Sequence, residues 1–223
     1  MTFKLLDLFC GAGGCSMGYH RAGFEVTGVD KNVQHSYPFK FIKADAMEID
    51  LEGYDCYHAS PPCQHFSIST RGNNDTWRSH PNLLEETRTR LKSTGKPYVI
   101  ENVVGAPMLE PITLCGTMFK GLRVIRHRLF ECNFYVRRLR CGKHYIIKRK
   151  KKHSKEAFVT IAGNTCTDLE GAKDAMGVDW MISLSRVTQT IPPYYTQYIG
   201  KYLADACNGT KDIKHYRPEW LIV

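Results

Sequence analysis

Residues 3–14 read FKLLDLFCGAGG, an apolar run that ends in a glycine-rich turn. Helical composition follows over residues 15–22, and a second apolar run over residues 25–29 ends at Asp30. This succession predicts a strand, a helix and a second strand, which is the βαβ unit of a parallel sheet. Glycines in such a turn let the backbone approach a ligand closely, and an acidic residue after the second strand can hold ribose hydroxyls. The stretch therefore predicts an α/β fold with a ligand at this turn.

The spacing of the glycines limits what that ligand is. Gly11, Gly13 and Gly14 do not fit the dinucleotide pattern G-x-G-x-x-G, and neither a Walker lysine nor its Ser/Thr follows. Nucleotide-binding folds and folds that bind an adenosyl cofactor share the general pattern. This turn alone therefore leaves both kinds of ligand possible.

A second stretch, residues 60–67, reads SPPCQHFS and places Cys63 directly after two prolines. It follows residues 54–59, which we expect to form a buried strand. Prolines fix φ and stiffen the backbone where the thiol emerges, which suits a residue that must meet a reacting atom at a set distance. The alternative is a packed cysteine, because free Cys is often buried. The stretch by itself does not separate the two.

Size and composition indicate one catalytic domain with a small appendage, since the chain has 223 residues. We expect a soluble, cytoplasmic protein, because the chain has no run of about 18 apolar residues and its first residues lack a signal-peptide layout. We also expect a monomer. The nine cysteines have irregular spacings, which favours reduced thiols over a disulfide framework.

The formal charge of +9 is concentrated in one segment, residues 132–155. This segment holds ten Lys and Arg and no Asp or Glu, while the rest of the chain has 21 basic and 22 acidic residues. The pattern favours nucleic acid as a partner, and no apolar helical face accompanies it to suggest a membrane surface. The candidate nucleic-acid-binding residues are Arg137, Arg138, Arg140, Lys148, Arg149, Lys150, Lys151 and Lys152.

Later segments supply further strands and helices. A buried strand at residues 98–100 delivers Glu101 to its carboxyl end, where ligands bind in parallel sheets. A satisfied surface carboxylate is the alternative for Glu101. We also expect a helix at residues 81–92, strands at 126–131 and 158–162, a helix at 168–176, and a last helix that begins at the prolines 192–193.

Five motifs now stand in order: the glycine turn, Pro-Pro-Cys63, Glu101-Asn-Val, Arg126-His-Arg128 and residues 191–200. This series, which spans about residues 3–206, resembles the cytosine-5 DNA methyltransferases. The resemblance implies a Rossmann-like, S-adenosylmethionine-dependent methyltransferase sheet with helices on both faces, plus a small basic lobe. One departure is Val124, where the family usually has Gln.

The resemblance also implies roles for single residues. Cys63 would add to carbon 6 of a cytosine flipped out of double-stranded DNA, and Glu101 would protonate or hydrogen-bond ring nitrogen 3. Arg128 would hold the carbonyl of the base, with Arg126 as a second candidate. The residues matched to S-adenosylmethionine binding are Phe9, Gly11, Ala12, Gly13, Gly14, Asp30, Asp45, Pro61 and Lys201.

Lys201 stands after Gly200, where the family has Gly-Asn in its last motif. We favour a solvent-facing lysine on a helix. The alternative puts a cation beside the cofactor, where it would accept a carboxylated analogue and so allow carboxymethyl transfer.

The expected organisation is a cofactor-binding and catalytic core at residues 1–131, a short basic target-recognition segment at 132–157 and a return to the core at 158–223. Because the segment is short, we expect short or relaxed sequence specificity. Zinc held by Cys132, Cys141, His144 and His153 is conceivable, since Cys141 and His144 have two residues between them. The other intervals are irregular, so we expect ordinary polar packing and no metal.

Two other functions stay open. A tRNA-modifying relative would carry a Cys-Phe-Thr tripeptide, which the chain lacks. A catalytically silent DNA-binding relative would be expected to lose Cys63 or the glycine turn, and the chain keeps both.

Overall fold

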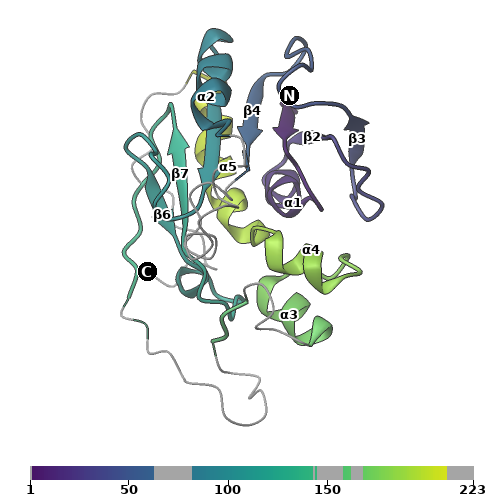
Figure 1. The fold of residues 1–223 in the computed structure, drawn as a ribbon. Helices are drawn as coiled ribbons and strands as arrows, with labels where there is room; N and C mark the ends of the chain where they lie inside the picture. Colours follow the sequence, from purple (N-terminus) through teal and green to yellow (C-terminus); the bar gives the residue numbers. More distant parts are fainter. Residues whose placement is uncertain (1, 63–81, 143, 145–157, 162–167, 210–223) are drawn as a thin grey trace.

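A computed structural model describes residues 2–62, 82–142, 144, 158–161 and 168–209 of the chain (Figure 1). Within these residues a seven-stranded sheet has the order β3-β2-β1-β4-β5-β7-β6. The strands are β1 (Lys4–Leu8), β2 (Glu25–Asp30), β3 (Lys40–Lys43), β4 (Cys56–Ala59), β5 (Tyr98–Asn102), β6 (Ile112–Leu114) and β7 (Arg128–Cys132). The helices are α1 (Gly14–Arg21), α2 (Leu84–Ser93), the 3₁₀ turn η1 (Gly116–Met118), α3 (Leu169–Met176), α4 (Leu184–Gln189) and α5 (Pro193–Cys207).

The strand directions fix where a ligand can bind. β3, β2, β1, β4 and β5 are parallel, while β7 and β6 are antiparallel to their neighbours. β1 is an interior strand that pairs with both β2 and β4, so the strand order reverses between β1 and β4. In open α/β sheets, ligands bind at the carboxyl ends of the strands beside such a reversal.

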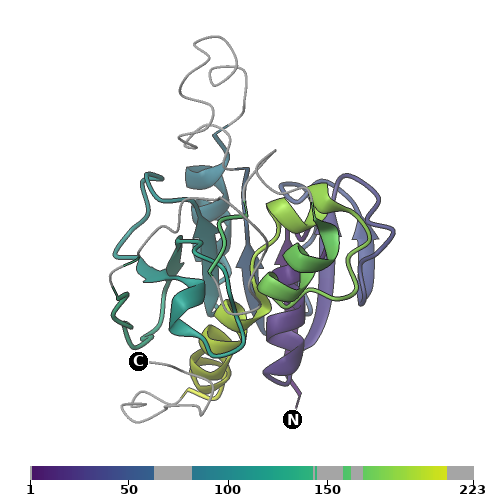
Figure 2. The same ribbon diagram turned by 90° about the horizontal axis from the view of Figure 1, so that it is seen from below.

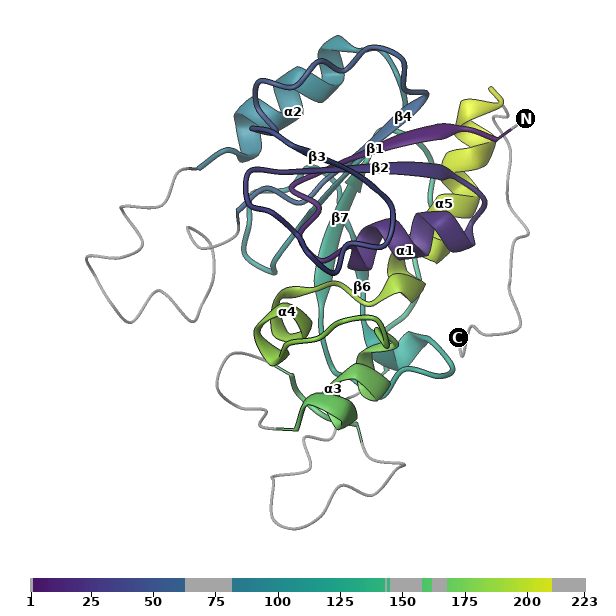
Figure 3. The same ribbon diagram turned by 90° about the vertical axis from the view of Figure 1, so that its right-hand side faces the viewer.

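Each face of the sheet carries its own apolar cluster. Leu5, Val26 and Val99 pack on one face together with residues of α1 and α5. Leu6 and Ile100 pack on the other face together with residues of α2. Figure 3 shows α2 on one side of the sheet and α1 and α5 on the other. Strands buried on both faces read as continuous apolar runs, which is the pattern of this sequence.

α3 and α4 pack against each other, as Figure 2 shows. Their core includes Met176 and Val187, and it also takes in Ala12 of the glycine turn and Val124. Val124, which stands in place of the family's usual Gln, is fully buried and forms a parallel bridge with Val159. Its side chain therefore packs against α3 and α4 and joins them to the rest of the core.

The structure confirms the predicted fold class and the opening βαβ unit. Of the strand expected at residues 158–162, the described residues 158–161 contain only the bridge at Val159. The sequence analysis did not predict the three-residue strand β6. Among the described residues, no helix is both long and apolar enough to cross a bilayer. The expected boundaries at residues 131 and 157 remain a prediction.

Candidate active site

The glycine turn leaves its backbone open to a ligand. Phe9, Gly11 and Gly13 have φ angles of 59°, 50° and 84°, in the left-handed region that a side chain makes costly. A Cβ on Gly11 would meet no atom within 4 Å, so the space beside its backbone is free. The Gly11 amide donates to Asp30 Oδ2 at 3.2 Å, which links the turn to the end of β2. This open backbone is a suitable cradle for an adenosyl cofactor.

An interaction that the sequence analysis missed supports the turn from below. The hydroxyl of Tyr37 donates to Ser16 Oγ at 2.8 Å, and Ser16 donates to Asp7 Oδ2. Asp7 is fully buried, and its Oδ1 has no hydrogen-bond partner among the described residues. Burial raises the pKa of Asp7 to about 7. The Tyr37 ring also contacts the position that a Cβ on Gly13 would take.

Trp180, which lies between α3 and α4, and the segment just before α5 cover the other side of the turn. Trp180 Nε1 donates to the carbonyl of Ala12 at 3.0 Å. A Cβ on Gly14 would overlap with Thr190 and the backbone of Ile191. Both contacts join segments more than 160 residues apart in sequence, so no local sequence pattern could predict them.

Asp45 lies beyond β3 on an exposed turn next to Asp30. Its Oδ1 accepts from the amide of Met47 at 2.8 Å, and the amide of Ala44 donates to the Asp30 carbonyl at 3.2 Å. The structure therefore brings Asp30 and Asp45 to the same edge of the sheet as the glycine turn.

The Pro-Pro segment leaves β4 at the reversal of strand order. The amide of Ser60 donates to the carbonyl of Leu8 at 3.1 Å, and Asn102 Nδ2 donates to the carbonyl of Pro61 at 3.2 Å. The predicted nucleophile Cys63 lies outside the described residues, one residue beyond Pro62. Its expected role therefore stays a prediction from the sequence.

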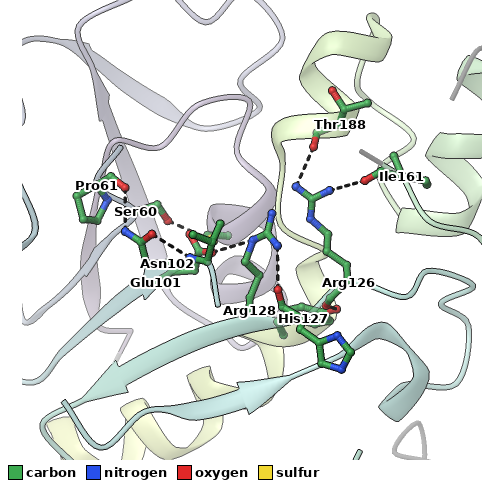
Figure 4. A network of polar contacts seen from close by, with 12 residues as sticks. Ser60, Pro61, Glu101, Asn102, Arg126, His127, Arg128, Ile161 and Thr188 are labelled. Carbon is green, nitrogen blue, oxygen red and sulfur yellow. Dashed lines mark hydrogen bonds and ion pairs between the residues drawn. The ribbon is translucent and has the colours of Figure 1, made fainter. Parts of the chain in front are cut away.

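Glu101 lies beside this segment at the carboxyl end of β5, and only 6% of it is exposed. Arg128 Nε lies 3.2 Å from Glu101 Oε1, and Ser60 hydrogen-bonds to the same carboxyl group, as Figure 4 shows. Burial raises the pKa of Glu101, while Arg128 and Ser60 act against that shift. Burial wins, so Glu101 keeps its proton to higher pH than an ordinary glutamate does.

A buried chain of polar side chains leads away from Glu101. Ser60 Oγ lies 3.0 Å from His58 Nε2, and His58 Nδ1 lies 2.9 Å from the hydroxyl of Tyr19. Burial lowers the pKa of His58 to about 3, so its imidazole is neutral. One ring nitrogen then donates and the other accepts, which fixes the orientation of Ser60 beneath Glu101.

The two motif arginines have different surroundings. The Arg126 guanidinium donates to the carbonyls of Ile161 and Thr188, at 2.9 and 2.8 Å (Figure 4). Those bonds join the segment just before β7 to Ile161 and to α4. Arg128 instead points to Glu101, so of the two it is the one placed for contact with a substrate.

The structure does not bring Lys201 to the glycine turn. Gly14 packs at the start of α5, whereas a Cβ on Gly200 would overlap with Ala22 at the far end of α1. Gly14 and Ala22 are eight residues apart, roughly 12 Å along a helix. Lys201 lies next to Gly200 and is therefore remote from the proposed cofactor cradle.

Arg137, Arg138 and Arg140 are exposed, and they follow the strand β7. The remaining candidate nucleic-acid-binding residues, Lys148, Arg149, Lys150, Lys151 and Lys152, lie outside the described residues. Cys132 opposes Val99 at the amino end of β5, and His153 lies outside the described residues as well. Cys141 and His144 do lie together, but Cys132 is not with them.

The strand order, the glycine turn and the acidic residues at the end of β2 and after β3 define an α/β fold of the methyltransferase class. Residues 3–108 match the family of C-5 cytosine-specific DNA methylases. Two solved structures cover most of the chain and share its fold. DNMT2 of Spodoptera frugiperda has a TM-score of 0.62, with 13% identity over 91% of this chain and 100% of that one. The methyltransferase EhMeth of Entamoeba histolytica has a TM-score of 0.60, with 13% identity over 92% of this chain and 98% of that one.

Three type II methyltransferases are also similar to this chain in sequence. The type II methyltransferase M.HgiGI of Herpetosiphon aurantiacus is 31% identical over 115 residues, which are 45% of this chain and 90% of that protein. M.FnuDI of Fusobacterium nucleatum, also a type II methyltransferase, is 43% identical over 115 residues, 46% of this chain and 33% of that protein. M.HgiCI of Herpetosiphon aurantiacus is 30% identical over 149 residues, 60% of this chain and 33% of that protein. The chain thus spans about one third of the length of the last two.

The chain belongs to the C-5 cytosine-specific DNA methylase family.

Proposed function

We propose that the protein transfers a methyl group from S-adenosylmethionine to carbon 5 of cytosine in double-stranded DNA. The observation that carries this proposal is the pairing of buried Glu101 with Arg128 beside the Pro61 segment, at the carboxyl end of the sheet. Family membership supports the same reaction.

The cofactor would lie on the glycine turn, beside Gly11 and Asp30. When bound, S-adenosylmethionine supplies an electrophilic methyl group on a sulfonium. The free space beside Gly11 fits a ligand that approaches the backbone, and exposed Asp45 offers a second acceptor at the same edge. Lys201 is not part of this site, so nothing in the structure favours the carboxymethyl alternative.

The protein's own groups would perform three tasks. The Cys63 thiolate adds to carbon 6 of the flipped cytosine, which makes carbon 5 nucleophilic. Protonated Glu101 donates to ring nitrogen 3, and so offsets the negative charge that this addition places on the ring. Arg128 donates to the carbonyl oxygen of the base. After methyl transfer, water takes the proton from carbon 5, the bond between carbon 6 and sulfur breaks and the Cys63 thiolate is released. The proton on ring nitrogen 3 then returns to Glu101.

Exposed Arg137, Arg138 and Arg140 support DNA as the partner, because phosphate contacts supply affinity that does not depend on sequence. Flipping the target base costs a few kcal/mol, and such contacts offset it. The relatives are type II methyltransferases, so we include protection of DNA from a restriction enzyme in the proposal. A thiol nucleophile must stay reduced, which supports a cytoplasmic location, and we propose that the protein acts as a monomer.

The test uses the purified chain, unmethylated double-stranded DNA and S-adenosylmethionine, followed by base-resolution sequencing of modified cytosine. We expect 5-methylcytosine at a short sequence, and none with the variant Cys63→Ser. Cys207→Ser is the matched control and should keep full activity, because Cys207 lies at the end of α5, away from the sheet edge that carries Glu101. Full activity of Cys63→Ser, or methylation of another base, would refute the proposal. RNA in place of DNA tests the tRNA alternative in the same assay.

A further inference from the structure

Four side chains that the proposed reaction does not use meet at the antiparallel end of the sheet. They are Cys115, His127, Cys141 and His144, and their ligand atoms all lie within 4.8 Å of one another. Cys115 is buried, and the other three are partly exposed.

Strand register brings the first two together. β6 and β7 are antiparallel, and Leu114 opposes Arg128. Cys115 follows Leu114 and His127 precedes Arg128, so these two residues form the next opposed pair beyond the ladder. Opposed side chains on one face of an antiparallel pair have Cβ atoms about 5 Å apart. The segment after β7 then supplies Cys141 and His144, with two residues between them.

The separations between donor atoms fit a tetrahedral ion. His144 Nε2 lies 3.5 Å from Cys115 Sγ and 3.2 Å from His127 Nε2, and His127 Nε2 lies 3.4 Å from Cys141 Sγ. Tetrahedral zinc with its usual bond lengths separates two nitrogens by about 3.3 Å, nitrogen and sulfur by about 3.6 Å and two sulfurs by about 3.8 Å. His144 Nε2 and Cys141 Sγ, 2.8 Å apart, would have to move apart on metal binding. The other two pairs, Cys115 Sγ with His127 Nε2 and with Cys141 Sγ, lie within 4.8 Å.

Hydrogen bonds alone do not account for the cluster. His144 Nε2 faces three polar atoms, of Cys115, His127 and Cys141, within 3.5 Å. A single imidazole nitrogen has either one N–H or one lone pair, so it satisfies one partner well. A cation at the centre satisfies all four groups at once, with two thiolates balancing its double charge.

We propose that the chain binds one structural Zn²⁺ ion through Cys115 Sγ, His127 Nε2, Cys141 Sγ and His144 Nε2. Two thiolates and two imidazoles are a donor set that zinc prefers, and four protein ligands leave no open position for a substrate. The site therefore stabilises structure and takes no part in the chemistry.

Its position suggests what it stabilises. His127 is the residue before Arg128, and its carbonyl accepts a hydrogen bond from Arg128 Nη1 at 2.8 Å. Cys141 directly follows Arg140 in the basic segment. The segment leaves β7 at Cys132, which opposes Val99 near the amino end of β5, and zinc would tie it back beside Arg128 at the opposite edge. The ion would thus hold the basic segment against the strand that carries Arg128.

The first test is the metal content of the full chain, purified without chelators from zinc-supplemented cells. We expect about one zinc per chain by mass spectrometry of the elements. Replacement by Co²⁺ should give the intense visible bands of tetrahedral cobalt and a near-ultraviolet thiolate-to-cobalt band. Absence of bound metal together with no tetrahedral cobalt spectrum would overturn the proposal. So would a Cys115–Cys141 disulfide in place of metal, seen as seven titratable thiols instead of nine.

Variants identify the ligands. Cys141→Ser and His144→Gln should each weaken zinc binding roughly tenfold or more in competition with a chelator. Cys132→Ser and Cys207→Ser are the matched controls and should retain zinc, because neither lies in the cluster. Loss of zinc from Cys132→Ser with retention in Cys141→Ser would refute this ligand set. Circular dichroism checks folding of each variant, and the cobalt spectrum of the unaltered chain decides the question if a variant fails to fold.

Metal content is measured without methyl transfer, so this proposal stands or falls independently of the proposed function.

Discussion

Glu101 is the residue whose surroundings say most about chemistry. It is buried, it contacts Arg128 and Ser60, and burial still raises its pKa. Because its pKa is raised, Glu101 keeps its proton to higher pH than an ordinary surface glutamate, which favours donation to a ring nitrogen. The alternative of a satisfied surface carboxylate is therefore wrong, since Glu101 is not at the surface.

The pH dependence of methyl transfer tests this role. If the protonated form is active, the rate should fall as pH rises through the raised pKa of Glu101. Glu101→Gln should slow methyl transfer by about 10²- to 10⁴-fold and remove this part of the pH profile. Glu52→Gln, at an exposed turn, should change neither quantity. An unchanged profile in Glu101→Gln would exclude Glu101 as the acid.

Ser60→Ala probes the buried polar chain. Ser60 lowers the pKa of Glu101, so its removal should raise that pKa further and move the fall in rate to higher pH. His58 Nε2 also loses its partner, which should cost about 1–3 kcal/mol of unfolding free energy. Ser93→Ala, on the exposed side of α2, is the control for both measurements. A profile that stays in place would show that Ser60 does not act on Glu101.

Among the elements, the pair α1 and α5 controls the geometry of the glycine turn. α5 packs against α1, and Gly18 lies where α1 approaches the backbone of α5 closely. A Cβ on Gly18 would overlap with the carbonyl of Pro193 and with Thr196. Close helix packing, and not turn formation, therefore requires glycine at this position.

Gly18→Ala should reveal this contact. Helix propensity alone would stabilise the chain by up to about 1 kcal/mol, but overlap with α5 should reverse the sign and cost about 1–3 kcal/mol. Arg21→Ala, on the exposed side of α1, changes helix propensity little and makes no overlap, so its stability should stay within about 0.5 kcal/mol of the unaltered chain. Denaturant unfolding measures both variants, and a stabilised Gly18→Ala would contradict the observed packing.

The comparison of sequence with structure also belongs at this scale. The strands of the parallel sheet and the helices that cover it were predictable, because both produce long apolar patterns. β6 was not, since three residues carry no periodicity. The metal cluster depends on that strand, because Cys115 and His127 meet only through the register of β6 and β7.

Contacts between residues far apart in sequence explain the other features that the sequence analysis did not predict. Tyr37 beneath the glycine turn and Trp180 above it belong to no motif, so the sequence analysis did not find them. Lys201 was matched to the cofactor by its position after Gly200, but the packing of Gly200 on Ala22 places it at the far end of α1. The order of motifs was enough to identify the last motif, residues 191–200. The distance of Lys201 from the glycine turn became known only from the packing of α5 on α1.

For the whole molecule, charge is unevenly spread, and DNA affinity should depend on salt accordingly. Replacing exposed Arg137, Arg138 and Arg140 together by alanine should weaken binding equally for all sequences. If each contacts one phosphate, the slope of log K against log salt should fall by about 2.7. Replacement of the exposed residues Lys31, Lys40 and Lys43 near β3 is a control of equal charge. Equal effects of the two triples would show that the basic segment has no special role.

The most direct measurement of the central claim traps the reaction on DNA that carries 5-fluorocytosine in place of cytosine. Fluorine does not leave carbon 5 as the proton does, so the bond between the enzyme and carbon 6 should persist. With S-adenosylmethionine present, we expect a stable covalent complex whose peptide map places the adduct on Cys63, and no complex with Cys63→Ser. An adduct on another residue, or methylation of cytosine without any trapped complex, would contradict the account.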